Sequence, residues 1–376
     1  MLIPNLIPLL AATAAAVSVA DVLSTNSNDL STLTTLLGTV PQLTSALTTA
    51  SNITVIAPSN AAFQAAMAAM PNLATMVKNT TFLTNLLEYH VVQGVVSSSM
   101  FSTTPVFAST ALQVPLAAGP SSQMVELLKS NADALVISGL KQVSRVTKAD
   151  LFFDGGVLHI VDSVLTVPET NLVTALDTGL TSLAGALNKT NMLAGVDALK
   201  DATVFAPSNA AFIQVGNVVE AASNELLSNV LEYHIVAGGA VKSTDLMKMA
   251  SANGGTTKLR TLQGGMLTIR QENGALYINS AEIMVADILT SNGVVHVIDN
   301  VMNPLATTAL PDTARETQVA DFAGASPVSN APFTSGVSAT TTVVPVTVAQ
   351  AGGHAAMPTA ALVGALGAAA AVIANI

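Results

Sequence analysis

Apolar positions along this chain follow two periods, and the same succession of periods occurs twice. Residues 54–63 (TVIAPSNAAF) and 203–212 (TVFAPSNAAF) differ only in having Ile56 where the second copy has Phe205. Each copy predicts a short buried strand, a Pro that ends it, and a Ser or Asn that caps a helix. Each predicted helix then carries apolar residues on one face: Phe63, Met67 and Met70 in the first copy, and Phe212, Val215 and Val219 in the second.

Two further blocks repeat in the same order, which shows that whole domains are duplicated. Residues 85–92 (NLLEYHVV) recur as 229–236 (NVLEYHIV). The motif Gly-Val-x-His-x-x-Asp also occurs twice, around His159 and His296. The separation between the copies shortens along the chain, which indicates loop-sized deletions inside a shared framework.

Leucine spacing predicts the helices of the first domain. Leucines between residues 30 and 47 predict two helices separated near Pro41, and residues 82–87 predict a helix that ends in a Tyr-His pair. From Gly94 to Val143 the pattern is too weak to predict elements.

The second domain opens with another leucine-rich helical pair and has a clearer β half. Residues 258–262, 266–270 and 276–279 alternate as strands do, and Asn273-Gly274 between the last two predicts a hairpin turn. The joint at 168–171 is short, so we expect the two domains to lie close together and to move little.

The three repeated blocks resemble, in their order and spacing, the sequence boxes and the central Tyr-His motif of the fasciclin-type adhesion domain. The resemblance extends from about residue 21 to residue 304 and occurs twice. It implies an α+β fold of two tandem domains, 21–167 and 168–305, each a twisted β core with helices packed around it. The scattered Pro residues are typical of a fungal rather than a plant member.

The resemblance also implies candidate recognition residues in the Tyr-His region and at an Asp-Ile step. These candidates are Tyr89, His90, Asp150, Leu151, Tyr233, His234, Asp287 and Ile288. The competing interpretation is structural: Tyr and His tie the helix end to the sheet by hydrogen bonds, because buried polar groups need partners. We favour this second interpretation and expect Ala substitutions to lower thermal stability before they affect binding.

The ends of the chain carry export signals. Residues 1–20 are apolar and end in small residues, which predicts a signal peptide cleaved before Asp21. Residues 306–353 are rich in Ser, Thr, Ala and Pro without periodicity, and they predict an extended, O-glycosylated stalk.

The C-terminal residues 354–376 are apolar and predict a signal for a glycosylphosphatidylinositol (GPI) anchor, whose attachment candidates are Ala351, Gly352 and Gly353. A tail-anchored or surface helix is the alternative. Sequons for N-glycosylation occur at Asn52, Asn79 and Asn188, in agreement with a secretory route.

Composition and motif geometry argue against several classes of chemistry. The chain has no Cys, which excludes disulfides and thiolate sites, and its formal net charge of −10 argues against nucleic acid and anionic membrane surfaces. On a strand, Asp162 points away from the face of His159, which argues against a metal clamp. Ser59 is explained as a helix cap, and Glu88 lacks the facing carboxylate of a glycosidase.

We therefore expect no enzyme, no cofactor and no metal, but a protein of cell-surface adhesion or of matrix and cell-wall association. Its expected partner is a cell-surface or matrix protein or a glycan, with homophilic binding left open, and a lipid anchor would hold it to a membrane. Two alternatives remain: a structural or organising protein of the cell wall or of an internal, vacuolar membrane, and a glycan-active enzyme with a cluster of carboxylates or His in one cleft.

Overall fold

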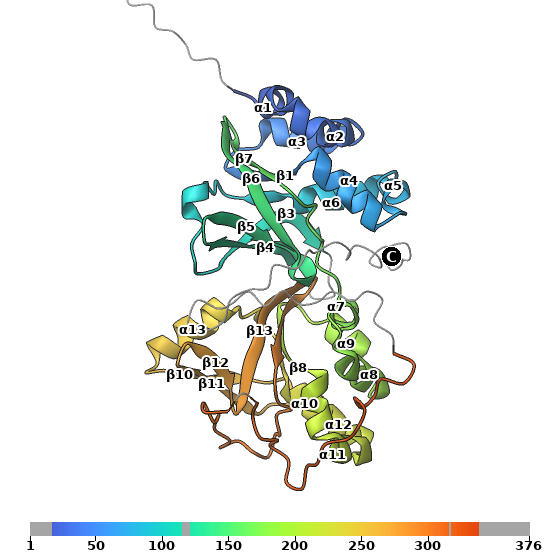
Figure 1. The fold of residues 1–376 in the computed structure, drawn as a ribbon, viewed down its shortest axis with the longest axis vertical. Coiled ribbons are helices and arrows are strands. Elements are labelled where there is room, and N and C mark those ends of the chain that lie inside the picture. Colours follow the sequence, from blue (N-terminus) through green and yellow to red (C-terminus); the bar gives the residue numbers. More distant parts are fainter. Residues whose placement is uncertain (1–16, 115–120, 316, 338–376) are drawn as a thin grey trace, which may run out of the picture.

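The structure, a computed structural model, describes residues 17–114, 121–315 and 317–337. The chain forms two domains, one above the other in Figure 1, each with most of its helices to one side of a β-sheet. This arrangement confirms the α+β fold with two tandem domains.

Domain 1 begins with three helices, alternates helices and strands through its middle, and ends in a run of strands. Its helices are α1 Val19–Thr25, α2 Ser27–Gly38, α3 Pro41–Thr49, α4 Asn60–Ala69, α5 Leu73–Met76 and α6 Thr80–Tyr89, with short 3-10 helices η1 Ser98–Met100 and η2 Gly139–Lys141. Its strands are β1 Ile53–Pro58, β2 Val91–Gln93, β3 Val106–Val114, β4 Ser121–Ser130, β5 Asp133–Ile137, β6 Val143–Phe153 and β7 Gly156–Val161. The seven strands close into a barrel in which β1 and β7 run parallel.

Domain 2 repeats this order with a barrel that stays open. Its helices are α7 Asn171–Asp177, α8 Thr181–Lys189, α9 Leu193–Asp197, α10 Asn209–Gln214, α11 Gly216–Ala221, α12 Asn224–Tyr233 and α13 Ser243–Ala252. Its strands are β8 Ala202–Pro207, β9 Ile235–Val236, β10 Thr256–Arg260, β11 Met266–Glu272, β12 Ala275–Ile278, β13 Ala281–Thr290 and β14 Gly293–Ile298. The sheet order is β10-β11-β12-β13-β14-β8-β9, with β14 and β8 parallel.

Each domain has an apolar core on each face of its sheet, and domain 1 has a further small cluster of Leu128, Leu135 and Ile137. Along β1, Val55 and Ala57 pack with the helices, whereas Ile56 points into the barrel and packs with Tyr89. This is the period of two that a buried strand imposes on its side chains. The central strand of each domain is therefore buried at every position, because both of its faces are covered.

The duplicated Pro-Ser-Asn sequence has the predicted capping role. Ser59 Oγ accepts a hydrogen bond from the amide of Ala62 at 3.1 Å, and Ser208 Oγ accepts one from Ala211 at 3.1 Å. The helices predicted from leucine spacing on either side of Pro41 are confirmed as α2 and α3.

The predicted hairpin of domain 2 is confirmed, while the first half of the barrel of domain 1 was not predicted. Asn273 and Gly274 have φ angles of 52° and 85° and join β11 to β12. In contrast, β3, β4 and β5 lie in the stretch where the alternation is weak. The helix predicted through Phe212 and Val219 is two helices, because α10 ends before Val215 and α11 begins after it.

The domains meet where η2 of domain 1 approaches β13 of domain 2 (Figure 1). Gln123 Nε2 donates a hydrogen bond to the carbonyl of Ser291 at 2.8 Å across this boundary. The joint itself is bonded to domain 2, since the amide of Ser291 donates to the carbonyl of Glu169 at 2.7 Å. These contacts are those expected for a short joint between closely packed domains.

The predicted extended stalk is wrong for residues 318–337. Residues 318–337, which we call the strap, lie against domain 2 without forming a helix or strand. Val328 donates its amide to the carbonyl of Ile213 at 3.0 Å, and Phe333 packs edge-on against Phe212. The prediction failed because the strap has no hydrophobic period of its own and uses isolated apolar residues to cover the core of domain 2.

The predicted signal-peptide cleavage before Asp21 falls inside α1. Residues 1–16 and 338–376, which include Ala351, Gly352 and Gly353, lie outside the described residues. Among residues 17–114, 121–315 and 317–337, no helix is long and apolar enough to cross a membrane.

Candidate functional site

The Tyr-His pair of each domain ends a helix and connects it to the sheet. In domain 1, Tyr89 donates its hydroxyl to the carbonyl of Met124 at 2.8 Å. His90 bonds through Nδ1 to the carbonyl of Leu86 at 2.7 Å, and its Nε2 accepts from the amide of Leu165 at 3.0 Å. Because Nε2 is an acceptor, His90 is the neutral tautomer with its proton on Nδ1.

Domain 2 reproduces these bonds closely. His234 bonds to the carbonyl of Val230 at 2.7 Å and accepts from the amide of Met302 at 2.9 Å. Tyr233 donates to the carbonyl of Met266 at 3.0 Å. Burial lowers the pKa of both His90 and His234 from 6.5 to about 4, so both rings are neutral at neutral pH. The bonds support the structural interpretation of the Tyr-His motif.

A second repeated network joins Asp, His and Ser. Ser98 donates its amide to Asp150 Oδ1 at 2.8 Å and its hydroxyl to Asp150 Oδ2. The amide of Asp150 donates to Nδ1 of His159 at 3.2 Å, and His159 Nε2 donates to the carbonyl of Val96 at 2.8 Å. Asp150 has a left-handed φ of 58°, which this hydrogen-bonded setting holds in place.

The same network in domain 2 consists of Ser243, Asp287 and His296. Ser243 donates its amide to Asp287 Oδ1 at 2.7 Å and its hydroxyl to Oδ2, while the amide of Asp287 donates to Nδ1 of His296 at 3.2 Å. His296 Nδ1 also lies 4.0 Å from Asp287 Oδ1, but this nitrogen is an acceptor and burial lowers the pKa of the ring. We therefore do not count the contact as an ion pair.

These three residue types are those of a hydrolytic triad, but their connections are different. In a triad the His accepts the proton of the Ser hydroxyl. Here the hydroxyl of Ser98 is bonded to Asp150, and both ring nitrogens of His159 are bonded to backbone groups. The network therefore fixes the loop before η1 to the sheet, and the ring of His159 does not accept the proton of the Ser98 hydroxyl.

Sequence reasoning missed Ser98 and Ser243 as members of this network. Both follow the Tyr-His block and both stand two residues after a Val, as Val96-Ser97-Ser98 and Val241-Lys242-Ser243. This shared Val-x-Ser is the signal that could have found them.

Most of the predicted recognition residues are inaccessible. Tyr89, His90, Tyr233, His234, Asp287 and Ile288 are each 3% exposed or less. Asp150 and Leu151 of domain 1 are half-buried. A partner of the folded protein can therefore approach this motif only in domain 1.

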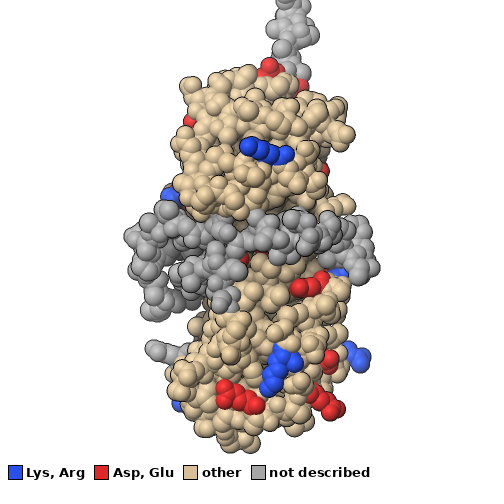
Figure 2. All heavy atoms as spheres, turned by 90° about the vertical axis from the view of Figure 1, so that its right-hand side faces the viewer, with Lys and Arg blue, Asp and Glu red and all other residues tan. Residues whose placement is uncertain are grey.

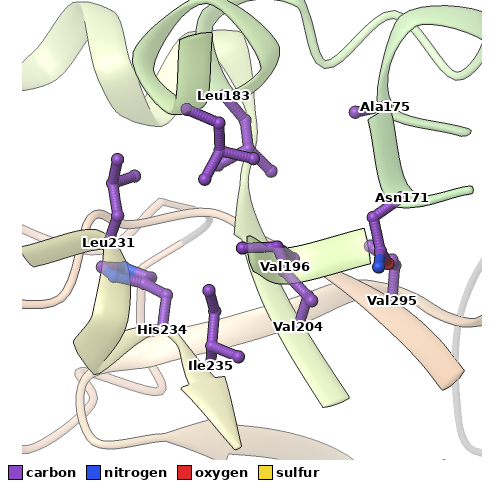
Figure 3. A pocket seen from close by; sticks show the side chains of 10 residues that line it. Asn171, Ala175, Leu183, Val196, Val204, Leu231, His234, Ile235 and Val295 are labelled. Carbon is purple, nitrogen blue, oxygen red and sulfur yellow. The ribbon is translucent and has the colours of Figure 1, made fainter. Parts of the chain in front are cut away.

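The space beside His234 does not form a ligand site. The cavity there, shown in Figure 3, has a volume of about 10 Å³ and is lined almost entirely by aliphatic side chains such as Leu183, Val204 and Val295. A similar cavity of about 20 Å³ lies beside His90 in domain 1. Both have room for roughly one or two waters at most.

Charged groups do not gather into a binding site in the part of the chain that the structure describes. No group of three His, Asp or Glu side chains there is placed to hold a metal ion. On the face shown in Figure 2, Lys and Arg are scattered among uncharged residues and do not form a basic patch. The described residues on this face therefore offer no surface complementary to a phosphate backbone.

The predicted N-glycosylation sites lie at the surface. Asn52, Asn79 and Asn188 are all exposed. Asn52 and Asn79 use their Oδ1 atoms as acceptors, from the amides of Val95 and Phe82, and these bonds leave Nδ2, the atom that carries a glycan, directed elsewhere.

Each of the two tandem α+β domains contains a buried Tyr-His pair and an Asp-His-Ser network. Together they define a class of two-domain α+β proteins whose repeated motifs have a structural role. The Fasciclin domain model matches residues 28–168 and 178–304. The chain therefore belongs to the fasciclin domain family.

The chain is also similar to individual known proteins. The chain is similar to a fasciclin-like arabinogalactan protein from Arthroderma benhamiae, with 32% identity covering 87% of this chain and 76% of that protein. It is also similar to a fasciclin-like arabinogalactan protein from Phaeosphaeria nodorum, with 30% identity covering 78% and 91%. A solved domain pair from the insect cell adhesion molecule Fasciclin I matches at 18% identity and a TM-score of 0.36, covering 74% of this chain and 98% of that one.

Proposed function

We propose that this chain is a non-catalytic cell-surface protein that adheres to a matrix or cell-wall partner through the exposed end of domain 1. Family membership supports an adhesion-type role, and the names of the fungal relatives support a setting in or near the cell wall. Within the described residues, the polar groups of the repeated motifs are engaged in internal hydrogen bonds, which favours surface contact over catalysis.

A difference between equivalent positions carries this proposal. Phe152 in domain 1 and Leu289 in domain 2 each stand two residues after the Asp of the network. Leu289 is 2% exposed, whereas Phe152 is 58% exposed. Domain 1 packs against the end of domain 2 that contains Leu289. The equivalent end of domain 1, which contains Phe152, is not covered by another domain in the described part of the chain.

The open end has the composition of a contact surface. Phe152 is accompanied by the half-buried Leu151 and by Val17, which is 47% exposed and whose carbonyl accepts from the amide of Asp154 at 2.9 Å. Exposed apolar groups rimmed by polar ones mark interaction sites, and an aromatic anchor is a common centre of binding energy. The expected partner therefore presents an apolar pocket or strip.

The test is attachment of cells that carry the full chain with Phe152→Ser, compared with Met284→Ser. Met284 is 51% exposed on β13 of domain 2 and serves as a matched control for loss of an exposed apolar side chain. We expect Phe152→Ser to reduce attachment at least tenfold with an unchanged melting temperature, and Met284→Ser to leave attachment unchanged. Equal attachment of both variants and the wild type would contradict the proposed contact surface.

We further propose that N-glycans at Asn52, Asn79 and Asn188 and a GPI anchor at Ala351, Gly352 or Gly353 accompany this role. Treatment of intact cells with a phosphatidylinositol-specific phospholipase tests the anchor. Release of the protein together with loss of attachment is the expected result. Retention of the protein, while a control GPI protein is released, would favour the structural role at a cell wall or internal membrane.

A further inference from the structure

The strap is held on domain 2 by groups that recognise main chain as well as side chains. Asn217 Nδ2 donates to the carbonyl of Gly324 at 3.0 Å, and Asn217 Oδ1 accepts from the amide of Ser326 at 2.7 Å. A single amide side chain thus binds the backbone on both sides of Ala325. Together with the bond from Val328 to Ile213, this places residues 324–328 along α10 and α11 in the manner of a bound peptide.

The strap also has an aromatic anchor. The ring of Phe333 meets Phe212 edge-on with 6.2 Å between ring centroids, and Lys189 Nζ lies 4.9 Å from the Phe333 centroid. Phe333 has a φ of 62°, which a bulky residue adopts only where its surroundings hold it. This geometry is that of a specific binding position for the Phe333 side chain.

Two glycines of domain 2 make room for the strap. A Cβ at Gly185 would lie 1.9 Å from the carbonyl oxygen of Phe333, and a Cβ at Gly216 would lie 2.1 Å from a methyl group of Val328. Neither Gly185 nor Gly216 has room for a Cβ while the strap is in place. Neither glycine has a positive φ, so close approach of the strap is the reason that these positions need glycine.

Domain 1 carries side chains at the equivalent positions. Ser182 and Thr32 are equivalent, because their amides bind the equivalent Asn209 and Asn60. Three residues further on, Gly185 of domain 2 therefore corresponds to Thr35 of domain 1. By the same alignment, Gly216 and Met67 each stand four residues after the repeated Phe. The strap-binding surface, formed by Gly185, Lys189, Phe212, Ile213, Gly216 and Asn217, is therefore a property of domain 2 and not of the shared fold.

We propose that this strap-binding surface is a peptide-binding site whose second occupant is the strap of another copy of this chain. The second strap offers the same Val328 and Phe333, so an exchange replaces every contact of the first. The side chains of Leu305 and Leu310, in the connection between domain 2 and the strap, are 89% and 64% exposed and so add little packing to it. Exchange of one identical element between two copies of a chain makes a dimer at low cost.

This pairing is independent of the proposed adhesive surface on domain 1. Phe152 lies in the other domain, and Phe152→Ser leaves every residue of the strap and of its binding surface in place. Failure of the adhesion test and failure of strap exchange are therefore separate outcomes.

The first test uses a labelled synthetic peptide of residues 318–337 and the full chain. In wild type the intact strap competes at the millimolar effective concentration of a tethered segment. In the variant Val328→Ser with Phe333→Ser the attached strap is weakened while the surface is intact. We expect the peptide to bind this variant at least tenfold more tightly than wild type, and to lose that binding when Gly216→Met is added.

The Gly216→Met change introduces the residue that domain 1 carries at the equivalent position in the sequence. Circular dichroism checks that each variant is folded. Equal, weak binding of the peptide to the folded variant and to wild type would overturn the proposal.

The second test needs no substitution and decides the matter if the weakened variant does not fold. Two batches of wild-type chain with different affinity tags are incubated together at high concentration, and one tag is captured. We expect the other tag to be co-captured, and excess unlabelled strap peptide, but not a scrambled one, to suppress this. Absence of co-capture, or co-capture that the peptide does not suppress, would contradict strap exchange.

Discussion

Lys141 Nζ lies 2.7 Å from Glu126 Oε2, and both side chains are buried near the boundary between the domains. Asp287 of domain 2 is close enough to raise the pKa of Glu126, which burial raises most strongly and Lys141 lowers. The net raised pKa shows that desolvation outweighs the attraction of the pair. The ion pair therefore matters chiefly because neither charge can be left alone.

Removing one charge of this pair should be costly. We expect Lys141→Met to lower the free energy of unfolding by about 3–5 kcal/mol, because Glu126 would stay buried without its partner. The double variant with Glu126→Gln should recover part of that loss. Chemical denaturation measures both values.

The exposed ion pair of Arg145 with Asp133, also 2.7 Å long, provides the matched control. Arg145→Met should change stability by less than about 1 kcal/mol, because solvent screens an exposed pair. If Lys141→Met were as mild as Arg145→Met, the buried pair would have no structural importance.

Acid should weaken the contribution of the buried histidines. Because the pKa of His90 and His234 is about 4 in the folded protein and near 6.5 when unfolded, the unfolded chain binds more protons between these pH values. Their stabilising effect is complete above pH 6.5 and declines as the pH falls to 4, by about 3 kcal/mol per residue. Glu169 acts in the opposite sense, since burial raises its pKa to about 7 and the folded chain takes up that proton first.

A variant separates these opposing effects. His234→Gln removes one titrating group and leaves Glu169 in place. We expect it to be less stable than wild type at pH 7, by about 1–3 kcal/mol for the lost hydrogen bonds. The difference from wild type should shrink as the pH falls from 6.5 to 4, and a constant difference in denaturation midpoints would refute the assignment of a neutral buried His234.

The close approach of Gly185 to the strap predicts a response that depends on position. Gly185→Ala should displace Phe333 and destabilise domain 2 by about 1–3 kcal/mol. Faster amide hydrogen exchange in the strap should accompany this loss. Gly195→Ala, in α9 with no atom near its added Cβ, should be neutral or stabilising by up to about 1 kcal/mol.

If both alanine variants exchanged hydrogen at the wild-type rate throughout the strap, the proposed close contact between Gly185 and the strap would be wrong. The comparison holds the substitution and the type of secondary structure constant. It therefore isolates the contact with the strap from the general effect of replacing a helical glycine.

The first helix predicts where the mature chain begins. Ser18 caps α1 by accepting from the amide of Asp21 at 3.1 Å, and Val19 is 6% exposed in the core. Cleavage before Asp21 would remove both, so we expect processing after the small residues at 14–16, leaving Val17 first. Mass spectrometry of the secreted protein checks this, and a mature terminus at Asp21 would show that the cap is dispensable.

Local signals in the sequence were enough for the helix caps and for one hairpin. Ser59 binds an amide three residues away, and Asn273-Gly274 reverses the chain within a single turn, so neighbouring residues decide both. The Tyr-His pair was recognised from its repetition. Its partners were not, because Leu165 and Met302 lie far along the chain and contribute only a backbone amide, which leaves no mark in the sequence.

The sequence by itself determined that one fold occurs twice, since each copy repeats the periods and caps that specify it. Only the tertiary structure decided what covers each copy. Phe152 and Leu289 hold equivalent positions and differ in exposure, and Leu289 lies two residues before Ser291, where domain 1 is bonded to domain 2. The strap has no period of its own, and its place depends on Gly185 and Gly216, more than a hundred residues away in the chain. Local patterns encode backbone conformation, whereas burial depends on which distant surfaces meet.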